Sequence, residues 1–82
     1  SLAMKKTIAS KIKPKRWKAS SGKIFSCREK IKILNQDIEE VNQVCQDALE
    51  DALLMDCDES QFRDAMFRVV DNLTNPYKKK EK

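Results

Sequence analysis

Apolar side chains recur every seven residues through the middle of the chain, from Ile24 to Met55. A repeat of this kind forms the a and d positions of a coiled coil, so it predicts a long helix over about residues 26–55 whose apolar seam meets another helix. Two parallel series make up the seam: Ile24, Ile31, Ile38, Cys45 and Ala52, and Cys27, Leu34, Val41, Ala48 and Met55.

A second, shorter helix is predicted over about residues 59–73. Asp58 is a suitable N-cap, and apolar residues follow it at helical spacing until Asn75 and Pro76 end the pattern. Three connecting residues, 56–58, would make the two helices antiparallel neighbours. The expected fold is therefore all-α, an antiparallel helical hairpin. Its expected core consists of Cys45, Ala48, Leu49, Ala52, Met55, Phe62, Met66, Val69 and Leu73.

The shorter helix is too short to cover the whole seam. About fifteen residues span roughly 22 Å, which reaches back over residues 41–55. Either a short helix over about 4–13 folds back onto the uncovered part, or a second chain covers it to form a bundle or coiled coil. The residues predicted to bind such a partner are Cys27, Ile31, Leu34, Ile38 and Val41.

The distribution of charge divides the chain in a different way from the pattern of apolar residues. Residues 1–30 hold ten Lys or Arg against one Glu, whereas residues 31–76 hold three against eleven acidic residues. We therefore divide the chain into a basic, flexible arm (1–22), a helical hairpin assembly domain (23–75) and a basic tail (76–82).

The arm contains a basic cluster around the single tryptophan. Such a cluster can bind nucleic-acid phosphates, act as a nuclear import signal, or serve as a solubilising arm whose tryptophan covers the exposed seam. The candidate contact residues are Lys11, Lys13, Lys15, Arg16, Trp17 and Lys18.

The composition argues against catalysis. The chain has no histidine and one glycine, which excludes histidine-based nucleophilic sites and glycine-rich phosphate loops. Cys27, Cys45 and Cys57 lack the short spacing of a zinc site and suit a reducing interior as small apolar side chains. No apolar run approaches the ~20 residues of a membrane span. We expect no cofactor, no metal, no small-molecule substrate and no membrane partner.

The leading hypothesis is a non-enzymatic helical interaction or oligomerisation module, part of a larger intracellular assembly, with the nucleus favoured over the cytoplasm. Its partner would be a second copy or another helical protein. The alternative is a nucleic-acid-binding domain in which the helices support the basic arm. A self-contained three-helix monomer is a third interpretation.

Overall fold

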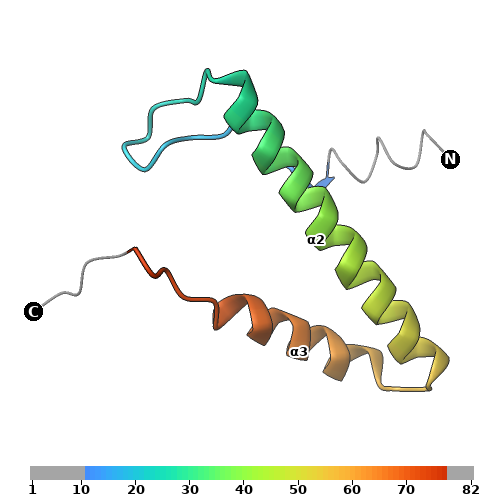
Figure 1. Cartoon of the computed structure of the whole chain (residues 1–82). Helices are drawn as coiled ribbons and strands as arrows, with labels where there is room; N and C mark the ends of the chain where they lie inside the picture. Colours follow the sequence, from blue (N-terminus) through green and yellow to red (C-terminus); the bar gives the residue numbers. More distant parts are fainter. Residues whose placement is uncertain (1–10, 78–82) are drawn as a thin grey trace, which may run out of the picture. The chain divides into compact units, whose positions relative to one another are not determined.

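The structure, a computed structural model, describes residues 11–77 of the chain (Figure 1). Its named elements are the helices α2 (Arg28–Leu54) and α3 (Glu59–Asp71). Within residues 11–77 there is no β-strand, and one isolated antiparallel bridge joins Lys18 to Ile24. The predicted all-helical fold is confirmed. The chain divides into two compact units, residues 1–46 and 47–82, with the boundary inside α2, and each unit is described by itself.

In the described part of the first unit, a loop over residues 13–27 turns back on itself before α2 starts. Ala19 N–H donates to the Lys23 carbonyl at 2.7 Å, and Gly22 N–H donates to the Ala19 carbonyl at 2.9 Å. Gly22 has φ +92°, a left-handed conformation that glycine adopts without steric cost. Phe25 N–H then donates to the Trp17 carbonyl at 2.9 Å, which closes the base of the loop.

The predicted N-terminal helix falls mostly outside the described residues. Lys11 and Ile12 have helical conformation, and Lys13 does not. The helical conformation ends just before Pro14, as expected of residues that precede proline. The rest of the predicted range 4–13, and most of the basic tail, lie outside residues 11–77.

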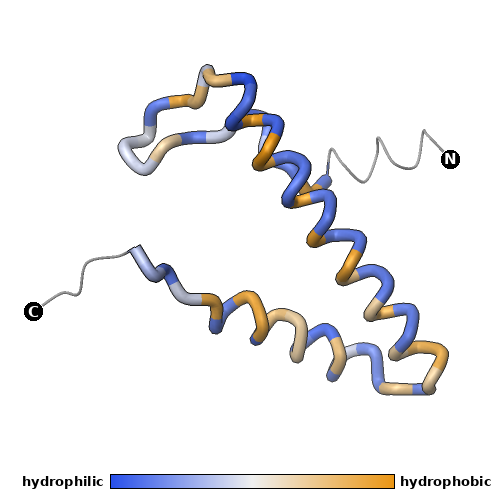
Figure 2. Tube along the Cα trace, in the orientation of Figure 1, coloured by the Kyte–Doolittle hydropathy of each residue, from blue (hydrophilic) through white to orange (hydrophobic). Residues whose placement is uncertain are grey.

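Helix α2 begins later than the heptad pattern predicts. The Cys27 carbonyl accepts the first helical bond, from Ile31 N–H at 3.1 Å, so Cys27 precedes the helix. Ile24 lies in the bridge with Lys18. The first two heptad positions are therefore not helical, because the loop uses that stretch for its own hydrogen bonds. Beyond them, α2 continues without Gly or Pro for 27 residues, and hydrophobic bands recur along it (Figure 2).

The C-terminal end of α2 is closed by a Schellman motif. Cys57 N–H donates to the Ala52 carbonyl at 2.9 Å, and Asp56 N–H donates to the Leu53 carbonyl at 3.1 Å. This motif needs a left-handed residue, and Asp56 supplies it with φ +62°, a conformation that aspartate tolerates better than most residues. Met55 therefore lies in the capping turn, one residue past the last helical position.

Helix α3 starts where the sequence predicts. The Asp58 carboxylate accepts a hydrogen bond from Gln61 N–H at 2.8 Å, which confirms Asp58 as the N-cap. The helix ends at Asp71 rather than about residue 73. Asn72 is the C-cap, and its side chain and its backbone N–H both donate to the Arg68 carbonyl, at 2.7 Å and 3.0 Å.

The core of the second unit lies where the end of α2 and α3 pack against each other. Leu49 and Ala52 are buried, with Ala52 only 2% exposed, while Phe62, Ala65 and Met66 are half-buried. Two helices that pack against each other are what a helical hairpin requires.

This core is smaller than the predicted one. Met55, Val69 and Leu73 are 75%, 65% and 72% exposed. Met55 lies in the capping turn, and Leu73 follows the end of α3. Val69 lies in the second half of α3, beyond Met66, which is the last half-buried residue of that helix. Ala48 is half-buried, as is Cys45 in the first unit.

Candidate interaction surfaces

The loop of the first unit is attached to α2 by two side-chain contacts. The indole N–H of Trp17 donates to Asn35 Oδ1 at 2.7 Å, and both residues are half-buried. Lys13 Nζ lies 2.6 Å from the Glu39 carboxylate. Asn35 and Glu39 are four residues apart, so they lie on one side of α2. The loop is thereby attached along about one turn of the helix.

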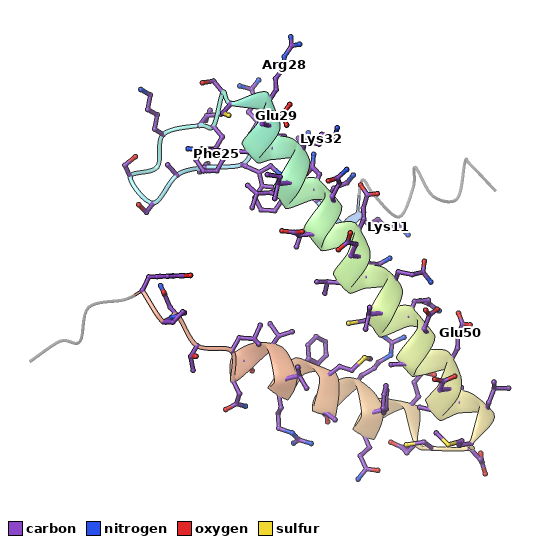
Figure 3. All side chains as sticks on the ribbon, in the orientation of Figure 1. Lys11, Phe25, Arg28, Glu29, Lys32 and Glu50 are labelled. Carbon is purple, nitrogen blue, oxygen red and sulfur yellow. The ribbon has the colours of Figure 1, made fainter. Side chains whose placement is uncertain are left out.

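A third contact lies where the loop enters the helix. Lys30 Nζ is 5.8 Å from the centroid of the Phe25 ring, within the range of a cation–π interaction. Figure 3 shows Phe25 on the loop beside the first turns of α2, with Arg28 and Glu29 extending from those turns. Phe25 is half-buried although it precedes the helix.

These contacts shelter part of the predicted partner-binding seam. Ile31, Leu34 and Ile38 are half-buried, while Cys27 and Val41 are exposed. The half-buried residues of the preceding segment are Ile12, Lys13, Trp17, Ala19 and Phe25. The middle of the seam is therefore shielded by the chain's own leading segment, and its two ends are not.

The sequence assigned residues 1–22 to a flexible arm and did not identify the contacts of Lys13 and Trp17 with α2. Their partners stand 26 and 18 residues further along the chain. Pairs so distant depend on the path of the loop, which local patterns do not specify. Trp17 is held against α2 by its hydrogen bond to Asn35.

The six basic-cluster residues fall into two groups in the structure. Lys13 and Trp17 contact α2, whereas the other four are exposed. The indole N–H of Trp17 is bonded to Asn35 and the ring is half-buried, so part of this side chain is occupied by α2. The exposed group consists of Lys11, Lys15, Arg16 and Lys18.

Large apolar side chains remain exposed on both helices. On α2 of the first unit these are Ile33, Val41 and Val44. In the second unit, four lie within seven residues, and Figure 2 colours most of that stretch as hydrophobic. They are Phe67, Val69, Val70 and Leu73. Sequence reasoning placed Val69 and Leu73 in the core and matched Phe67 to the small residues of α2, but all three side chains are exposed.

Metal-binding clusters and buried polar atoms without partners are both absent from the described residues. Within residues 11–77, no group of three or more His, Cys, Asp or Glu side chains is placed to hold a metal ion, and no buried side-chain nitrogen or oxygen lacks a hydrogen-bond partner. Cys27, Cys45 and Cys57 are free thiols. Neither α2 nor α3 is long and apolar enough to cross a membrane. The main chemical feature of the described residues is exposed apolar surface next to charged side chains.

Comparison with known proteins adds no relative to this description, because no family model, curated protein or solved structure matches the chain.

Proposed function

We propose that the chain is a non-enzymatic helical protein–protein interaction and oligomerisation module. The observation that carries the proposal is the imbalance between buried and exposed apolar residues. Among the described residues, two hydrophobic side chains are buried and twelve large ones are exposed. Isolated exposed apolar residues are ordinary, but a contiguous group on one helix is typical of a binding surface.

The energetic argument favours a partner. Moving one large apolar side chain from water into an interface is worth roughly 1.5–3 kcal/mol. A small domain has a total stability of about 5–15 kcal/mol, so covering the exposed residues 67–73 is a substantial gain. We place the main contact on these residues rather than on the middle of the heptad seam, which the loop partly shields. Val41, which is exposed on α2, remains available for a coiled-coil contact.

Sedimentation equilibrium of the whole chain tests the proposal. At about 50 µM, an interface with a Kd near 1 µM is mostly formed, so the wild-type chain should sediment as a dimer or larger. The double variant Phe67→Ser, Val70→Ser should weaken association about tenfold or more, since each removes exposed apolar area from the contact. Tyr77→Ser, which also removes an exposed aromatic ring, serves as the matched control. A wild-type chain that is monomeric with full helicity contradicts the proposal.

A second candidate is nucleic-acid binding through the loop, which the exposure of Lys15, Arg16 and Lys18 favours. Neutralising all three with glutamine should weaken binding to a labelled oligonucleotide and reduce the slope of log affinity against log salt by about 2–3. Arg68→Gln, an exposed cation on α3, is the control. Equal salt slopes for wild type and the triple variant would exclude this function for the loop. A nuclear location is part of the proposal under either candidate function.

A further inference from the structure

The exposed apolar face of α3 lies between acidic side chains. Phe67 is 65% exposed, and Asp64 and Asp71 stand three residues before it and four residues after it. At that spacing, side chains on a helix are neighbours. The ring is therefore flanked by a carboxylate on each side along the helix. Residues 47–77 as a whole contain eight acidic residues and two arginines.

The loop of the first unit and the first residues of α2 carry the opposite charge. Residues 11–30 contain eight Lys or Arg and one Glu. Lys18 and Ile24 face each other across the antiparallel bridge, and both are exposed. Directly paired residues in such a bridge hold their side chains close together. The loop thus presents an aliphatic side chain beside a cation, with Lys15 and Arg16 also exposed nearby in sequence.

The loop is also held in a defined position. Trp17 and Lys13 attach it to α2, so the backbone that carries its exposed cations is already ordered before they bind. A preformed surface loses less conformational entropy on association than a flexible tail does. Arginine in addition stacks well on aromatic rings and pairs with carboxylates, and the α3 face offers both kinds of group.

We propose that the apolar face of α3 binds the basic loop of a second copy of this chain. The inference rests on the proposed assembly function and names the partner. Ile24 of one copy covers Phe67 and Val70 of the other, while the loop cations meet Asp64 and Asp71. The charge complementarity between residues 11–30 and 47–77 selects a second copy over a partner of unrelated sequence.

A charge-swap experiment tests the inference on the whole chain. The loop-reversed variant is Lys15→Glu, Arg16→Glu, Lys18→Glu, and the helix-reversed variant is Asp64→Lys, Asp71→Lys. Each alone places like charges across the contact and should associate about tenfold or more weakly than wild type at low salt. Mixed in equal amounts, they restore opposite charges at every proposed contact and should associate about as tightly as wild type. The double variant Asp37→Lys, Glu40→Lys, at exposed positions of α2, matches the change of net charge in the helix-reversed variant.

The outcomes separate this inference from the proposed function. If wild type associates but the reversed variants associate equally well, or their mixture shows no gain, the loop–α3 contact is wrong while the assembly function stands. If wild type associates independently of salt between low and high ionic strength, the contact is likewise wrong. If wild type does not associate at all, the loop–α3 contact and the proposed assembly function are both wrong. Circular dichroism of each variant must show wild-type helicity for the comparison to count.

Discussion

Replacing Ala52 with aspartate should detach α3 from α2. Ala52 is the most deeply buried residue of the hydrophobic core, at 2% exposure, and an ionised carboxylate there has no cationic partner among the core residues. Burying an unpaired charge costs several kcal/mol, which exceeds what a core of this size supplies. An isolated helix of 13 residues is marginal in water, so α3 should lose its helical structure as well as its packing.

The loss is measurable in two ways. Since α3 provides 13 residues beside the 27 of α2, the helical circular dichroism signal of the described helices should fall by about a third. Hydrogen exchange of the α3 amides should approach the unprotected rate, while amides in the first half of α2 change little. Leu54→Asp places the same charge on an exposed residue two positions away and should cost only about 0.5 kcal/mol, from the helix dipole. Full protection of α3 in Ala52→Asp would show that the two helices do not pack through this residue.

Replacing Trp17 with alanine should release the loop from α2. The substitution removes a half-buried aromatic side chain together with its hydrogen bond to Asn35. Burying about half of an indole contributes roughly 2–4 kcal/mol, and the hydrogen bond about 1 kcal/mol. The remaining ion pair between Lys13 and Glu39 is solvent-accessible and contributes less than about 1 kcal/mol, so it cannot hold the loop alone.

Two measurements report the release of the loop: hydrogen exchange of its amides and dye binding to the newly exposed seam residues. The amide protons of Ala19, Gly22 and Phe25, which are hydrogen-bonded in the loop, should exchange faster, and binding of a hydrophobic dye should increase as Ile31 and Leu34 lose cover. Tyr77→Ala removes an aromatic ring that is 92% exposed and should change neither. Asn35→Ala removes the polar part of the contact alone and should give the smaller effect, about 1 kcal/mol. Unchanged exchange in Trp17→Ala would mean that the loop is held by other contacts.

Local signals in the sequence were enough to predict the hairpin. Asp58 caps α3 through its own side chain, and the small residues of α2 with the large ones of α3 follow from helical spacing. The end of α3 was predicted about two residues too late, because the prediction relied on Asn75 and Pro76 and did not identify Asn72 as the C-cap. Met55 was assigned to the core by its heptad position, but the left-handed turn at Asp56 places it outside the helix.

The contacts between distant segments could not be predicted. Nothing in the spacing of residues 13–18 indicates that Trp17 meets Asn35, because a turn at Gly22 and the bridge between Lys18 and Ile24 first have to set the direction of the chain. The heptad repeat likewise marks Ile24 as a seam position although it lies in the loop. The repeat identified apolar residues that are unfavourable in water. The path of the loop determined which of them the chain shields with its own residues.

The chain carries a single indole, and it sits where the loop meets α2. Its fluorescence is therefore an intrinsic reporter of how any binding partner engages the molecule. A ligand that takes the place of the loop on the helix moves the ring into water and shifts its emission to longer wavelength. A ligand that docks on the outer side of the loop leaves the emission unshifted, so one label-free titration distinguishes the two modes of attachment.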